Sequence, residues 1–284
     1  MNPVAAQRDS VLAPARPFEW LTGIPKTLAG SARDVTRRSR LGTVAAAVAS
    51  TGVLIAYDQQ IFDETRRFGG RIDLSSSHPV SALWVGSSKL FYVPTTISSG
   101  LYYLGDGWTT MLVAGTYYVT GKVRGDNRAV CTASEITESM FALGIVTQTL
   151  KHATGRQTPG TATEPRGAWH PFVKWSEYSR NTPRYDAMPS GHLATAMATV
   201  TVIAANYPDS RWVKPIGYSL MGGLAFTMVN DGVHWVSDYP LALLIGGTIG
   251  KIAAERGHVL TPAAIDGRVE PLVSTTGVGL RVRW

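Results

Sequence analysis

The hydrophobic and polar positions of this chain fall into long blocks. Apolar stretches of helical length lie at about 41–57, 82–104, 106–121, 128–151, 190–207, 213–230 and 236–254. Blocks of this length are typical of α-helices. Residues 279–284 alternate apolar and basic side chains with a period of two, which predicts a short terminal strand. We therefore expect an all-α fold, a bundle of about six helices with a short C-terminal strand.

The connection between residues 151 and 190 differs from the rest of the pattern. It holds five prolines and several aromatic residues. A long connection inside a compact helical domain is usually functional or disordered, and the aromatic content favours an ordered, packed loop. We expect an active site at the end of the bundle where this loop meets two helix starts.

The first apolar stretch, Leu41–Tyr57, has 17 residues and carries no charge. A helix needs about 20 apolar residues to span a bilayer, with about 17 as the lower end. Residues 1–40 hold seven basic and three acidic side chains, and such a flank places the N-terminus in the cytoplasm and the following chain outside. The pattern predicts a membrane anchor, with an export signal or a buried helix of a soluble fold as alternatives.

Composition narrows the class of protein further. Only 17% of the residues are charged and the mean hydropathy is +0.02, which argues against a disordered polyelectrolyte and against a protein built mostly of lipid-facing helices. The single Cys131 excludes an intramolecular disulfide framework and a cysteine-based zinc cluster. More than half of the net charge of +7 lies in residues 1–40, and no basic run interleaved with aromatics follows later in the chain, so we expect no nucleic-acid partner.

One tetrapeptide marks a candidate anion site. Pro189, Ser190, Gly191 and His192 end the long connection and open an apolar stretch. A helix that starts in this way leaves backbone N–H groups free, and these groups favour an anion together with the helix dipole. The alternative is an ordinary serine-capped helix with a surface histidine.

Two further pairs carry candidate chemistry. His234 and Asp238 are four residues apart and would face each other on a helix, where the carboxylate fixes the tautomer of the ring. Lys151 and Arg156, at the end of another apolar stretch, are suited to bind an oxyanion. Taken alone, the first pair is also compatible with a structural contact, and the second with a basic helix C-terminus.

The order of these groups along the chain resembles the type 2 phosphatidic acid phosphatase superfamily, which also includes bacterial acid phosphatases and vanadium haloperoxidases. The resemblance covers about residues 90–254. It rests on these residues: Lys151, Arg156, Pro189, Ser190, Gly191, His192, His234 and Asp238.

The resemblance implies a two-step phosphatase or phosphotransferase reaction that needs no metal ion and no cofactor. His234 would attack phosphorus and form a phosphohistidine, with Asp238 orienting its ring, and His192 would act as acid and then as base. The groups that the resemblance assigns to the oxyanion are the side chains of Lys151 and Arg156 and the backbone N–H groups of Ser190 and Gly191.

The resemblance also implies a substrate and a location. The substrate would be a lipid phosphate, such as phosphatidic acid or a prenyl diphosphate, or a small phosphate ester. The site would face the outside of a bacterial-type inner membrane, or the periplasm. We accordingly divide the chain into a basic, proline-containing tail (1–40), an anchor or first helix (41–57), a phosphatase-like domain (58–258) and a C-terminal extension (259–284).

The chain departs from the superfamily pattern at two positions. Thr158 and Met228 stand where members of the superfamily carry the arginines that grip phosphate oxygens. Arg156, Arg180 and Arg184 are candidates to replace them. Without replacement the site would stabilise a transferring phosphoryl group poorly, because that group carries charge on three oxygens.

These departures leave three other functions open. The same scaffold would catalyse another transfer or hydrolysis, such as acyl transfer, if its substrate carries less charge. A vanadium haloperoxidase is a further alternative, although such sites also rely on arginine to hold vanadate. The last is a catalytically weakened binding or structural protein, against which the joint presence of His192, His234 and Asp238 argues.

Overall fold

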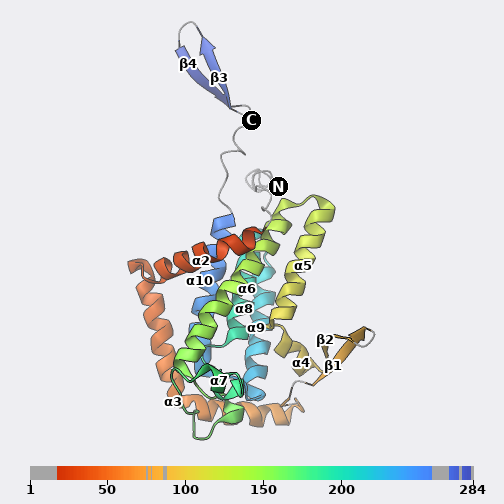
Figure 1. Ribbon diagram of the computed structural model, residues 1–284, viewed down its shortest axis with the longest axis vertical. Coiled ribbons are helices and arrows are strands. Elements are labelled where there is room, and N and C mark those ends of the chain that lie inside the picture. The colour runs from red at the N-terminus through yellow and green to blue at the C-terminus, as the bar shows by residue number, and fades with distance from the viewer. Residues whose placement is uncertain are drawn as a thin grey trace.

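The computed structural model describes residues 18–74, 76–77, 79–85, 88–257, 269–274 and 277–282. The fold is all-α, as predicted, and the described residues contain nine α-helices and two small antiparallel hairpins. The long helices of the bundle run side by side (Figure 1). They are α5 (Gly107–Arg124), α6 (Asn127–Thr154), α8 (Gly191–Asn206), α9 (Val213–Asn230) and α10 (Tyr239–Gly257).

Helix α8 occupies the centre of the bundle and packs against α6, α9 and α10. Its contact with α10 is close because small residues face each other. A Cβ atom added at Gly246 or Gly250 would lie 2.3 or 2.7 Å from the main-chain oxygen of Ala194 or Ala198. Small residues of this kind let two helix backbones approach each other. The core around this contact is apolar, which fixes α8 firmly in place.

Two helices at the start of the described chain surround the bundle. Helix α2 (Glu19–Val35) lies across one end, and α3 (Leu41–Arg71) runs along the side and then beneath the opposite end (Figure 1). A short 3₁₀ turn, Arg38–Arg40, connects them. The predicted tail therefore contains a helix, and the remainder of the tail, residues 1–17, lies outside the described residues.

The predicted helix at 82–104 is wrong over most of its length. This region forms strands β1 (Val80–Val85) and β2 (Ser88–Pro94), and only then the short helix α4 (Ile97–Tyr103). The two strands are antiparallel partners. They flank Gly86 and Ser87 in the sequence, and turn residues between two apolar runs are typical of a hairpin.

The remaining elements are short. The predicted terminal strand is confirmed as β4 (Gly277–Val282), which pairs with β3 (Val269–Ser274). Most of the rest of the predicted C-terminal extension lies outside the described residues. In the connection between α6 and α8 the chain forms 3₁₀ turns Pro159–Thr161 and Thr182–Arg184 and helix α7 (Trp175–Tyr178), and a 3₁₀ turn Val236–Asp238 precedes α10.

Candidate functional site

The predicted helix start at Pro189 to His192 is confirmed. Helix α8 begins at Gly191, and the Oγ atom of its N-cap, Ser190, accepts a hydrogen bond from the N–H group of Leu193 at 3.4 Å. The backbone N–H of Ser190 donates to the main-chain oxygen of Asp238 at 3.2 Å. That bond occupies an N–H group expected to face the oxyanion, and it joins the first turn of α8 to the turn before α10.

His192 lies in the first turn of α8 and is partly buried. Its ring centroid is 5.0 Å from that of Tyr102 on α4. Burial raises the pKa of the Tyr102 phenol to about 12. The phenol therefore stays protonated at neutral pH, so it adds no negative charge beside His192.

Lys151 lies in the last turn of α6 and points to the start of α8. Its Nζ atom donates to Oδ2 of Asp186 at 2.7 Å and lies 3.7 Å from the position that a Cβ atom would take at Gly191. The hydroxyl of Tyr178 donates to the other oxygen of Asp186. Burial and the Asp186 carboxylate raise the pKa of Tyr178 well above its usual range, so this phenol remains a donor.

A glycine allows the chain to leave α6 in the required direction. Gly155 caps the helix in the left-handed conformation, with φ of 53°. A Cβ atom here would lie 1.8 Å from the main-chain oxygen of His170. Only glycine avoids both the conformational strain and this collision. The turn brings Arg156 directly into the interior.

His234 and Asp238 meet as predicted, but not on an α-helix. His234 lies in an irregular turn after α9, and Asp238 ends the 3₁₀ turn before α10. The Nδ1 atom of His234 is 3.3 Å from Oδ2 of Asp238, which also accepts the backbone N–H of Trp235 at 2.8 Å. A proton on Nδ1 leaves Nε2 with a free lone pair, as a nucleophile requires.

Arg156 is fully buried between two carboxylates. Its Nη1 atom donates to Oδ1 of Asp238 at 2.8 Å, and its Nη2 atom donates to Oδ2 of Asp58 at 2.6 Å. The same two nitrogens also donate to Oγ of Ser237 and to the main-chain oxygen of Arg166. The terminal nitrogens of Arg156 are thus bonded to the protein itself, and its assignment to the substrate stays a prediction.

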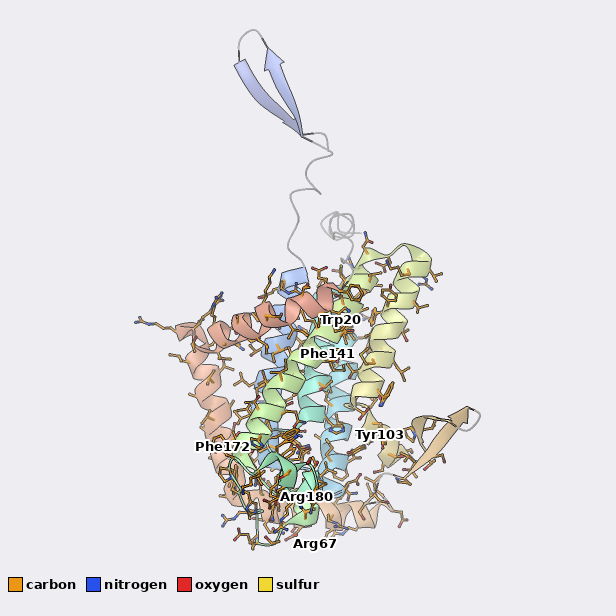
Figure 2. The ribbon with its side chains drawn as sticks, viewed as in Figure 1. Trp20, Arg67, Tyr103, Phe141, Phe172 and Arg180 are labelled. Carbon is orange, nitrogen blue, oxygen red and sulfur yellow. The ribbon has the colours of Figure 1, made fainter. Side chains whose placement is uncertain are left out.

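The positions that depart from the superfamily pattern are both buried. Met228 belongs to the apolar core, and Ser190 Oγ approaches its sulfur at 4.0 Å. Thr158 bonds through its backbone N–H to the main-chain oxygen of Pro183 at 3.2 Å. Arg180 and Arg184 are exposed near the same end of the molecule, where Figure 2 labels Arg180. No contact places either arginine beside Lys151 within the described residues.

Three participants were missed by sequence reasoning: Asp58, Asp186 and Ser237. Asp58 directly follows the charge-free stretch Leu41–Tyr57, and Asp186 lies just before the tetrapeptide in the proline-rich connection. An acid placed directly after an apolar stretch was an available signal. Its partner is 98 residues away, and no local pattern indicates that partner.

An apolar cavity of about 380 Å³ lies beside the site between α8, α9 and α10. Leu193 and Tyr239, which adjoin the candidate histidines in sequence or space, are part of its wall. Three of its residues, Met197, Tyr218 and Leu243, also line a groove of about 800 Å³ that runs between α3 and the bundle. The cavity and the groove are therefore adjacent.

Residues 133–258 match the family model of the PAP2 superfamily, which is the superfamily of type 2 phosphatidic acid phosphatases. This range holds all seven candidate site residues, and the match confirms the resemblance. A stretch of 74 residues, 26% of this chain, is 31% identical to a protein of Porphyromonas gingivalis named lipid A 1-phosphatase. The chain covers only 16% of that relative's length. No solved structure matches the chain with statistical significance.

Proposed function

We propose that the protein is a metal-independent phosphatase or phosphotransferase acting on a lipid phosphate, because residues 133–258 match the family model of the PAP2 superfamily. One observation carries the proposal furthest. The ring of His234 is held by Asp238 at the same end of the bundle where the Lys151 ammonium approaches the start of α8. A nucleophile, its orienting carboxylate and a cation thus come together beside a helix N-terminus.

The reaction has two steps. In the first, Nε2 of His234 attacks phosphorus, the bond to the leaving oxygen breaks, and His192 gives that oxygen a proton. In the second, His192 takes a proton from water, the water oxygen attacks the phosphohistidine, and inorganic phosphate leaves. For transfer, an acceptor hydroxyl replaces water. Lys151 and the backbone N–H of Gly191 stabilise the oxygens of the transferring group.

A lipid substrate is supported by the surface of the molecule. The 34 residues Arg38–Arg71 and the 28 residues Asn127–Thr154 are long and apolar enough to span a bilayer. Only 11% of the apolar window in the first segment is buried, compared with 67% in the second. Large apolar side chains are also exposed on α5 and α9. Apolar surface of this extent is typical of a membrane or partner interface.

The cavity and the groove beside the site support the same conclusion. Both are lined mainly by apolar side chains, and the cavity reaches Leu193 and Tyr239 next to the candidate histidines. A lipid whose phosphate lies at Lys151 would place its chains there. The relative named lipid A 1-phosphatase supports a lipid phosphate as the substrate class.

The test is release of phosphate from phosphatidic acid, a prenyl diphosphate and lipid A in detergent micelles. We expect wild type to release phosphate from at least one of them, and His234→Ala to lose at least about a thousandfold in kcat because the nucleophile is gone. The matched control is Glu64→Gln on the exposed surface of α3, which should keep wild-type activity. Folded wild-type protein that releases no phosphate from any of these substrates would contradict the proposal.

A second reaction is supported by the charge of the site. Lys151 is already paired with Asp186, and Met228 is buried where an arginine was expected. Such a site also suits a group with less charge, such as an acyl ester. Vanadate, which mimics a transferring phosphoryl group, distinguishes phosphoryl transfer from acyl-ester hydrolysis. Inhibition by vanadate is expected for phosphoryl transfer, and hydrolysis of an acyl ester that vanadate does not inhibit would favour the second reaction.

A further inference from the structure

We propose that Asp58 on α3 is a positioning residue, which acts on the nucleophile His234 through Arg156 and Asp238. The inference rests on the proposed function of His234. It also gives Arg156 a role other than direct contact with substrate.

The contacts form a continuous chain from α3 to the histidine. Oδ2 of Asp58 accepts from Nη2 of Arg156 at 2.6 Å, and Nη1 of Arg156 donates to Oδ1 of Asp238 at 2.8 Å. The other oxygen of Asp238 lies 3.3 Å from Nδ1 of His234. One planar guanidinium therefore joins the two carboxylates, and its fork geometry fixes both of them.

Asp58 also holds the turn that carries Asp238. Its Oδ1 atom accepts the backbone N–H of Ser237 at 3.0 Å, and its Oδ2 atom accepts the Ser237 hydroxyl at 2.6 Å. Ser237 is the residue next to Asp238, so three hydrogen bonds from different groups converge on one carboxylate of α3. Displacement of the Asp58 carboxylate would therefore move Asp238, which orients the ring of His234.

The charges give Asp58 a second effect. The side chains of Asp58, Arg156 and Asp238 are completely buried, so water screens their interaction very little. With both aspartates ionised and the arginine protonated, the network carries one net negative charge. That charge stabilises the positive ring that His234 acquires when it is phosphorylated. If Asp58 were neutral, Arg156 would cancel Asp238 and the ring would lose this stabilisation.

The surroundings of Arg156 indicate that its ion pairs with Asp58 and Asp238 belong to the packed interior. The guanidinium lies 4.9 Å from the ring centroid of Trp169 and 5.4 Å from that of Trp235. The indole N–H of Trp235 donates to the main-chain oxygen of Gln157 at 2.8 Å. The aromatic rings exclude water from the network, which makes each charge in it more effective.

The first variant is Asp58→Asn, which removes the charge and keeps the shape. We expect kcat to fall by about 100-fold with KM changed by less than about threefold, because the substrate contacts are untouched. Among the described residues, the charged and titratable groups around His234 include Asp238, Arg156 and Asp58, with Tyr239 against its ring and with Lys151 and His192 at the neighbouring helix start. Loss of one negative charge should move the acid limb of kcat/KM down by about one pH unit.

Two more variants distinguish the effect of the position of the Asp58 carboxylate from the effect of its charge. Asp58→Glu keeps the charge and should leave the acid limb in place while kcat recovers only in part. Ser237→Ala removes the two hydrogen bonds of this hydroxyl, one from Arg156 and one to Asp58, and leaves every charge. We expect kcat to fall by about fivefold to tenfold without a shift of the acid limb. Ser237→Ala also serves if Asp58→Asn fails to fold, which circular dichroism and thermal unfolding would reveal.

The outcomes distinguish this inference from the proposed function. If wild type and Glu64→Gln release phosphate, His234→Ala does not, and folded Asp58→Asn keeps the wild-type kcat and pH profile, then Asp58 has no positioning role. A wild-type kcat in Ser237→Ala would contradict the inference in the same way. If wild type itself releases no phosphate and forms no phosphohistidine, the proposed function fails and the inference fails with it.

Discussion

Lys151 shows how the local charge of a site depends on partners that lie elsewhere in the chain. Its ammonium is almost completely buried, and the side chain is only 7% exposed. Asp186 compensates the charge, and Tyr178 completes the hydrogen bonds of that carboxylate. A buried cation without such a partner would be costly. If Lys151 binds the phosphate, as we propose, the arriving anion meets a cation whose charge Asp186 already partly compensates.

Replacement of Lys151 by methionine tests whether this shared cation still binds the anion. Lys151→Met keeps much of the apolar stem and removes the charge, so vanadate should inhibit about tenfold more weakly and kcat should fall by about 100-fold. Lys151→Arg is the matched control, since it retains the charge. Equal vanadate inhibition of wild type and Lys151→Met would mean that the ammonium does not contact the transferring group.

At the scale of the element, the end of α6 decides where two functional side chains point. Lys151 lies in the last turn of this helix, and the left-handed residue Gly155 turns the following Arg156 into the interior. The backbone of Arg156 also bridges to Trp169 and Asp186, which fixes the long connection against the helix end. One helix terminus thus positions both Lys151, which we propose binds the substrate, and the Arg156 network that contacts the partner of His234.

Gly155→Ala should therefore destabilise the protein and its site together. The left-handed conformation and the collision with His170 predict a loss of at least about 2 kcal/mol of unfolding free energy. Gly144→Ala on the same helix meets nothing within 4 Å and should be neutral or stabilising by about 0.5–1 kcal/mol. Urea or thermal unfolding in detergent measures both, and equal stability of the two variants would show that the helix end tolerates a side chain.

At the scale of the whole molecule, the site and helix α2 lie at opposite ends of the bundle. Figure 2 labels Arg67 and Arg180 at one end and Trp20 near the other. Between the two ends, α3 exposes apolar side chains such as Val48 and Val53, which are 56% and 60% exposed. A molecule with polar ends and an apolar side surface is suited to cross a bilayer.

Cysteine labelling tests this arrangement in a Cys131→Ser background, which leaves each variant with one thiol. In right-side-out membrane vesicles, a membrane-impermeant maleimide should label Arg67→Cys, and should label Arg33→Cys only after permeabilisation. It should not label Val53→Cys in either case, because lipid would cover this position. Labelling of Val53→Cys at the rate of Arg67→Cys would show that the side of α3 faces water.

Several features of the fold and site followed from local pattern alone. The apolar blocks predicted the long helices because the residues of a buried or amphipathic helix that face the core are apolar and lie within one continuous stretch of sequence. The start of α8 at Gly191 and the pairing of His234 with Asp238 were also local, since each joins residues within a few positions. The hairpin at 80–94 was missed because an apolar run fits a strand or a helix equally well.

The amino-acid sequence by itself determined the helical class, the superfamily motifs and the two histidines. Only the tertiary structure decided what surrounds them. It paired Lys151 with Asp186, buried Met228 in the core and joined Arg156 to Asp58 across 98 positions of the chain. Charges interact through space and strengthen with burial, so their partners depend on how distant segments pack rather than on any periodicity along the chain.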